Sequence, residues 1–180
     1  QLHEKQLRDI EAAIDNYAAA LGGNQKQSAA LEALERLLLD PDARAQAAEV
    51  LEPIYVGQHR WHDLIRVHEA KLESAADPTE RLRITRFVAR LYEEQLEDFE
   101  SACKWYAKVF REAPDDPGVR DQLQRLASIV GNWEFVAQTY QQYLDDESGE
   151  SADVREVAIA AASIYDRRIN NIDAAFHAYR

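Results

Sequence analysis

Cysteine and methionine are nearly absent from this sequence. Its 180 residues include one cysteine, Cys103, and no methionine. A single thiol excludes an intramolecular disulfide and a zinc site built from cysteines. We predict that Cys103 is a small, half-buried apolar side chain, the usual state of a free cysteine on a helix. Because the sequence begins with Gln1, we expect it to begin elsewhere than at a natural initiation site.

Long apolar runs are missing as well. None approaches the roughly 18 residues that a membrane-spanning helix needs, and the opening QLHEKQLRDI lacks the apolar middle of a signal peptide. The composition, 46% hydrophobic and 30% charged, is that of a globular chain able to bury a core. We therefore expect a soluble protein without direct membrane contact, and a cytoplasmic location is favoured.

Positive charge is scarce. Lysine and arginine number 21 against 33 aspartate and glutamate residues, which leaves a net charge of −12. Such a surface repels phosphate backbones and anionic lipid head groups. Nucleic acid is therefore excluded as an expected partner.

What the sequence does contain is an internal repeat. Helix-like patterns open at Gln27, Trp61, Phe99, Trp133 and Ile172, and shorter and longer intervals between them alternate regularly. Mostly apolar side chains recur three and seven positions after each opening residue, which is one face of a helix. The residues at these positions are Ala30, Leu64, Ala102, Val136 and Ala175, and Leu34, His68, Tyr106, Tyr140 and Tyr179.

The repeat is sharper over twice that length. The segment LYEEQLEDFESACKWY at 91–106 aligns throughout with IYDRRINNIDAAFHAY at 164–179, one double repeat later. Trp61 and Trp133 also occupy equivalent positions of this double repeat, so we predict that both pack in the core. A partner helix is predicted before each of the five repeated patterns. These helices are expected at about 2–21, 42–57, 79–96, 117–130 and 152–169.

The turns agree with this division. GGNQ at 22–25 separates the first two helices. Three Asp-Pro pairs, in DPDA, ADPTE and DDPG, are expected to open helices, with aspartate as the cap and proline at the first helical position. Gly57 and Gly131 are expected to close first helices. No segment combines β-branched residues with strict alternation, so the chain is predicted to be all-α.

The segment DFESACKWYAKVFREAPDDP at 98–117 resembles the second helix and exit turn of a tetratricopeptide repeat, through the spacing of Ala102, Tyr106 and Val109 before Pro114. The resemblance covers essentially the whole chain and implies a right-handed α-α superhelix of about ten antiparallel helices. The array is similar to the degenerate, extended repeat proteins of bacteria, and we expect it to be a piece of a longer superhelix. The resemblance implies one solenoid over residues 1–180, with units at about 1–41, 42–77, 78–116, 117–150 and 151–180, the last incomplete.

Candidate sites for chemistry are few. His59, His62 and His68 are candidate metal ligands, since the first two are three positions apart. Against a metal site, His68 takes a stripe position that points into the core and His59 falls in a turn. We therefore predict one packed and two solvated histidines. The sequence has no nucleophile or phosphate-loop motif, so we predict a non-catalytic protein without a cofactor or metal.

One feature departs from the repeat. Arg83, Arg86 and Arg90 share a face of the predicted helix 79–96. In tetratricopeptide proteins the first helix of each pair lines the concave groove, so the resemblance implies that this stripe receives an acidic side chain or C-terminal carboxylate of a partner. The alternative is that the arginines pair with carboxylates of their own or adjacent helices. The counterparts one double repeat later are Glu156, Ile159 and Ser163.

Two functions fit these observations. The favoured one is a non-catalytic scaffold that grips an extended peptide or helix of a protein partner, or that stacks on itself end to end. The other is a structural or regulatory repeat segment of a larger multidomain polypeptide, with a catalytic or membrane-anchored portion elsewhere. RNA processing through the related half-a-tetratricopeptide repeats fits the helix pairs but conflicts with the negative charge.

Overall fold

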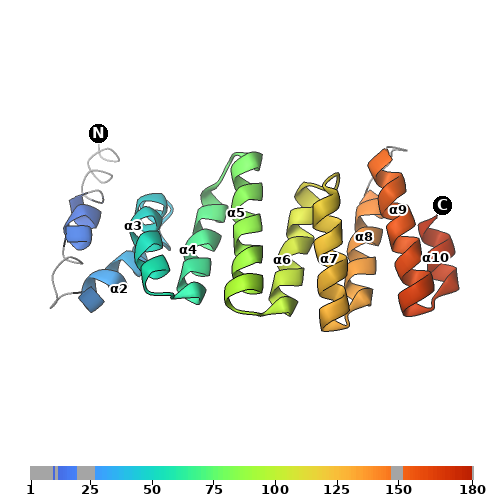
Figure 1. Cartoon of the computed structure of the whole chain (residues 1–180). Helices are drawn as coiled ribbons and strands as arrows, with labels where there is room; N and C mark the ends of the chain where they lie inside the picture. Colours follow the sequence, from blue (N-terminus) through green and yellow to red (C-terminus); the bar gives the residue numbers. More distant parts are fainter. Residues whose placement is uncertain (1–9, 11, 20–26, 147–151, 180) are drawn as a thin grey trace. The chain divides into compact units, whose positions relative to one another are not determined.

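The computed structural model of the chain describes residues 10, 12–19, 27–146 and 152–179. These residues form helices joined by turns, with no strand among them (Figure 1). The predicted all-α class is confirmed. Residues 12–19 are helical, and the later helices are α2 (Gln27–Leu37), α3 (Arg44–Gly57), α4 (Trp61–Ser74), α5 (Pro78–Arg90), α6 (Phe99–Glu112), α7 (Pro117–Val130), α8 (Trp133–Asp146), α9 (Ala152–Ile164) and α10 (Ile172–Ala178).

The helix starts follow the repeat. The helices α2, α4, α6, α8 and α10 begin at the five residues where the repeated pattern opens. The break predicted at GGNQ lies outside the described residues. None of the described helices is both long and apolar enough to cross a lipid bilayer.

Two of the three Asp-Pro pairs open helices as predicted. Asp77 accepts a hydrogen bond from the backbone N–H of Glu80 at 3.0 Å, and Pro78 is the first residue of α5. Asp116 accepts from the N–H of Gly118 at 2.8 Å, and Pro117 begins α7. Each carboxylate satisfies an N–H group that the first helical turn leaves without a backbone partner.

The prediction for the first pair, Asp40 and Pro41, is wrong. Helix α3 begins only at Arg44, and its N-cap residue, Ala43, makes no side-chain cap. The Asp40 carboxylate instead accepts the N–H of Asp42 at 3.0 Å inside the turn. The Asp40 carbonyl receives the N–H groups of Ala43 and Arg44 at 3.2 and 2.8 Å, so a backbone turn leads into α3.

Each half of the double repeat contains a wide helical turn at the equivalent position. Helix α5 continues into a π-helical turn at Leu91–Gln95, and α9 continues into another at Tyr165–Ile169. The π-helical turn wraps more residues than an α-helical one, so it accommodates the extra residues that lengthen these two connections. Each connection then reverses through a left-handed residue, Glu97 at φ 51° and Asn170 at φ 59°.

The chain divides into two compact units, Gln1–Ile84 and Thr85–Arg180. In the first unit α2 packs on α3, and α3 packs on α4. The predicted single solenoid with five repeat units stays a prediction. The largest fully buried side chains of the first unit are Tyr55, Leu34, Leu51, Leu64, Ile84, His68 and Val67.

In the second unit each helix from α6 to α10 packs on the next one in sequence, and α6 also contacts α8 (Figure 1). Such neighbour-by-neighbour packing is typical of helical repeats, in which one pair cannot bury its apolar face alone. The Phe110 ring lies against Tyr140 and Tyr143, with centroids 5.0 and 5.5 Å apart. The handedness of the superhelix stays a prediction.

The predicted apolar stripe forms the core of both units, except in α10. Tyr179 is 66% exposed and Ala175 is only half-buried. Cys103 is more deeply buried than predicted, and burial raises the pKa of its thiol to about 11. The buried stripe members are Ala30, Leu34, Leu64, His68, Ala102, Tyr106, Val136 and Tyr140.

Candidate functional site

The three arginines of the predicted binding stripe have different environments. Arg83, in the first unit, pairs with Glu80 of its own helix through two contacts of 2.7 Å. Arg86 lies in the second unit and contacts Asp116, the cap of α7, at 2.7 Å. These pairs lower the pKa of both carboxyl groups. Arg90 is exposed, and no ion pair of Arg90 occurs within the described part of the chain.

The positions equivalent to this stripe in the second half of the repeat face an open hollow. Glu156, Ile159 and Ser163 lie on α9, one double repeat after the three arginines, and all three line a hollow of about 590 Å³. We call this hollow the α7–α9 groove. Its full lining is Gln124, Trp133, Glu156, Ile159, Ala160, Ser163, Ile164, Arg167 and Arg168.

An aromatic ring and a guanidinium group form one wall of the α7–α9 groove. The Arg168 guanidinium lies 4.6 Å from the centre of the Trp133 ring. The electron-rich face of an indole attracts a cation at this distance. Trp133 is half-buried, as is Trp61, so the prediction that both pack in the core is wrong. Each is the first residue of a helix, directly after a turn.

A buried arginine holds the groove's carboxylate. Arg120 is 7% exposed, and its guanidinium donates to the Pro114 carbonyl at 2.6 Å and to Glu156. The Tyr140 hydroxyl donates to the Arg120 carbonyl at 3.3 Å. Arg120 therefore links α7 to the preceding turn, α8 and α9. Because the Glu156 carboxylate is already paired with Arg120, the exposed guanidinium of Arg167 adds positive charge to the lining of the groove.

The sequence did not single out Arg120. An arginine in the first turns of a helix, followed by an aspartate as Arg120 is, normally reaches to solvent. Its burial depends on Glu156, which lies two helices further along the chain. The arginine and its distant partner give no local pattern that identifies the pair.

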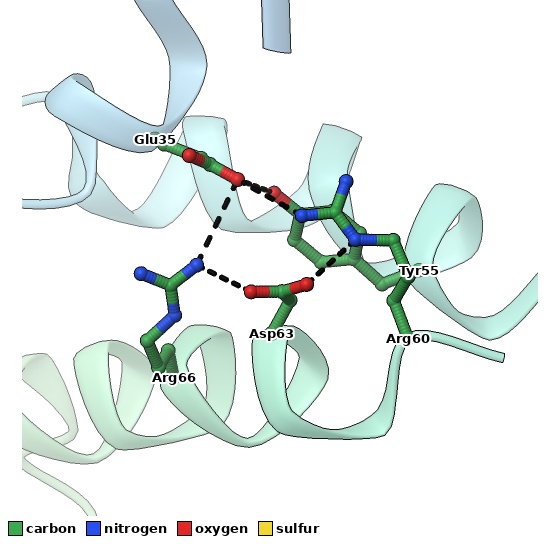
Figure 2. A network of polar contacts seen from close by, with 5 residues as sticks. All are labelled: Glu35, Tyr55, Arg60, Asp63 and Arg66. Carbon is green, nitrogen blue, oxygen red and sulfur yellow. Dashed lines mark hydrogen bonds and ion pairs between the residues drawn. The ribbon is translucent and has the colours of Figure 1, made fainter. Parts of the chain in front are cut away.

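The first unit contains a polar network between α2, α3 and α4 (Figure 2). The Tyr55 hydroxyl donates to Glu35, and Arg60 contacts Asp63 at 2.6 Å and Glu35 at 3.5 Å. Arg66 also contacts both carboxylates. Burial favours the neutral form of Asp63, but hydrogen bonds from Arg60 and Arg66 outweigh it and lower the pKa. Burial, with the Glu35 hydrogen bond, raises the pKa of Tyr55.

This network lies beside a cavity of about 240 Å³. Four of its five residues, all except Arg60, line the cavity. The two carboxylates and the guanidinium groups of Arg60 and Arg66 alternate in space, as Figure 2 shows. The network thus joins three helices through groups that satisfy one another. We assign it a structural role in holding α2 against the α3–α4 pair.

The histidines lie as the sequence predicts. His68 is 1% exposed in the first unit's core, with its Nε2 atom 3.6 Å from a Glu52 oxygen. His59 and His62 are exposed, and the His59 ring contacts Trp61 edge-on at 5.2 Å. Among the described residues, no three side chains of metal-binding type gather into a group that would hold an ion.

Comparisons with known proteins do not assign a family. No protein-family model matches the chain, and a search of the curated proteins finds no match. The functional argument therefore depends on the residues and contacts described above.

Proposed function

We propose that the chain is a non-catalytic protein-interaction scaffold of the tetratricopeptide type, which holds an extended peptide or a helix of another protein in the α7–α9 groove. The repeated helix pairs, opening at the residues predicted from the pattern, support the repeat type. The observation that carries the binding function is the groove itself. The face of α9 that corresponds to the arginine stripe of α5 borders open space instead of a packed helix.

The groove's chemistry suits a peptide. Ile159, in its lining, is 52% exposed, so burial of this side chain by an apolar group of a partner is favourable. Arg167 offers an exposed guanidinium for a partner's carboxylate or backbone carbonyl. Backbone polar groups of an extended chain also find hydrogen-bonding groups in Gln124 and Ser163.

Peptide display tests this proposal. Peptides of about 15 residues, long enough to cross the groove when extended, are selected on the immobilised chain, and their dissociation constants are measured by fluorescence anisotropy. Ala160→Arg fills the groove with a long side chain and should weaken selected peptides at least about tenfold. Ala152→Arg makes the same change on α9 outside the groove lining and should leave affinity unchanged.

Circular dichroism must show equal helicity for the two variants. Selection of no peptide would contradict the proposal, as would equal binding by the Ala160→Arg chain and the unmodified chain. A peptide that loses affinity equally with both variants binds elsewhere on the protein.

A further inference from the structure

The cavity of about 240 Å³ beside the polar network of the first unit has both apolar and charged walls. We call it the α2–α4 cavity, because α2, α3, α4 and the turn after α2 line it. Leu39 and Ala70 are among its apolar side chains. Its charged side chains are Glu35, Asp63, Glu69, Glu73, Arg44 and Arg66. The volume is many times what one water molecule needs, so the cavity has room for a side chain of another molecule.

One carboxylate of the α2–α4 cavity has no cation beside it. Arg44 contacts Glu73 at 2.9 Å, and Arg66 contacts the two carboxylates of the network, as Figure 2 shows. Glu69 is exposed on α4, and no ion pair of Glu69 occurs among the residues that the structure describes. Both guanidinium groups of the lining are therefore engaged, while the negative charge of Glu69 is left uncompensated.

The second unit has an equivalent hollow, which contains an arginine of the chain itself. Counted from the first residues of their helices, Leu39 corresponds to Arg111 and Ala70 corresponds to Gln142. Arg111 and Gln142 both line a hollow of about 740 Å³, as Leu39 and Ala70 line the α2–α4 cavity. The Arg111 guanidinium donates to the Oε1 atom of Gln142 at 2.9 Å and so reaches from α6 to α8. A guanidinium group is thus compatible with this register of the repeat.

The first unit has a leucine in place of this arginine and carboxylates in place of neutral residues. Glu69 corresponds to Gln141, and Glu35 corresponds to Ala107. Leu39 is 79% exposed, the largest exposed fraction of any large hydrophobic side chain in the described part of the chain. A leucine and an uncompensated carboxylate in one cavity suit an arginine, which has an apolar methylene stem and a cationic head.

We propose that the α2–α4 cavity binds an arginine side chain of a partner protein. The guanidinium pairs with Glu69, and the methylene stem lies against Leu39, in the register that Arg111 occupies in the second unit. The net charge of −12 attracts a basic segment of a partner toward the chain. The site does not depend on the proposed function, because the α7–α9 groove is lined by residues of the second unit and the α2–α4 cavity by residues of the first.

Arginine blocked by an acetyl and a methylamide group is the probe for this site. NMR spectra of the isotope-labelled full chain follow the titration through the backbone amide shifts. The amides of Glu69 and Ala70 should shift saturably, with a dissociation constant of about 0.1–1 mM, as expected for a ligand of this size. Blocked citrulline has nearly the same shape without the charge and should bind at least about twofold more weakly.

Two matched pairs of variants locate the site. Leu39→Arg puts an arginine of the chain itself in the register of Arg111 and should weaken binding of blocked arginine at least about tenfold. Val56→Arg adds the same charge on α3 outside the lining and should leave the affinity unchanged. Glu69→Gln should weaken binding about two- to fivefold. Glu49→Gln removes an exposed carboxylate of α3 outside the lining and should have no effect.

Several results would overturn the proposal. Equal binding of blocked arginine and blocked citrulline is one, and equal binding by Leu39→Arg and the unmodified chain is another. Equal weakening by Glu69→Gln and Glu49→Gln would reduce the effect to general charge attraction. Tighter binding of blocked leucine than of blocked arginine would assign the cavity to an apolar side chain. Tighter binding of butylguanidinium, which has no peptide groups, would assign it to a small organic cation instead of a protein.

Discussion

Acidification should destabilise the first unit through His68. This side chain is 1% exposed, and burial lowers its pKa from 6.5 to about 4. Lys71 and Arg83 act in the same direction, while Glu52 and Glu80 oppose them. The folded unit therefore keeps His68 neutral at a pH where an unfolded chain binds a proton. Below about pH 6.5 proton uptake favours unfolding, and the loss is complete once the pH falls below about 4.

The magnitude follows from the two pKa values. Each unit of difference is worth about 1.4 kcal/mol, so the full effect is about 3 kcal/mol. Between pH 7.5 and 5 it amounts to about 2 kcal/mol. Stopping at about pH 5 avoids the lower range in which carboxylates such as Asp63 take up protons.

Urea denaturation followed by circular dichroism measures the effect. In the His68→Leu variant, the free energy of unfolding of the first unit should lose about 2 kcal/mol less between pH 7.5 and 5 than in the unmodified chain. His62→Leu removes an exposed histidine of the same helix and should keep the original pH dependence. If His68→Leu and the unmodified chain lose stability equally over this range, the burial argument for His68 is refuted.

Three further predictions concern the arginines and the glycines. Arg120→Ala should lower the free energy of unfolding of the second unit by about 1–3 kcal/mol in urea, because it removes a buried side chain that hydrogen-bonds both the Pro114 carbonyl and the Glu156 carboxylate. Gly131→Ala should lower the free energy of unfolding by about 1 kcal/mol, because Gly131 has φ 76°, which an alanine adopts only with strain. Gly57→Ala should raise it by about 0.5–1 kcal/mol, because Gly57 is the last residue of α3 and a Cβ there meets open space. Thermal melts that rank the two variants in the opposite order would contradict both predictions. Replacing both Arg86 and Arg90 by Glu should leave the affinity of a peptide selected on the α7–α9 groove unchanged, because both lie on α5 outside its lining; abolished binding in anisotropy titrations would return these arginines to the binding surface.

The sequence was sufficient to place the helices because burial repeats with the helical period. The second helix of each pair needs apolar side chains at fixed positions, and residues such as Leu64 and Val136 are fully buried there. Local chemistry was less reliable at the turns. Asp116 caps its helix, but Asp40 satisfies a turn N–H, since a carboxylate beside proline serves either geometry.

Gly57 and Gly131 both lie at the ends of first helices, as predicted, but with different backbone geometry. The sequence predicts both as helix-closing glycines, yet only Gly131 is a left-handed cap. After Gly57, the left-handed position falls on His59, at φ 54°. Which residue reverses the chain depends on the length of the connection and on what the next helix packs against. A residue's own identity does not determine this.

The site depends on differences between equivalent positions. Arg86 and Ile159 occupy the same register of first helices one double repeat apart, and a repeat pattern alone treats them as interchangeable. In the structure, Arg86 is held by Asp116, the cap of α7, while Ile159 is exposed and lines two hollows. A salt bridge of half-exposed groups contributes little binding energy to a partner, since the partner must replace it. An exposed isoleucine gains from every apolar atom that covers it. The proposed groove therefore draws its apolar contribution from the position where α9 departs from the arginine of α5.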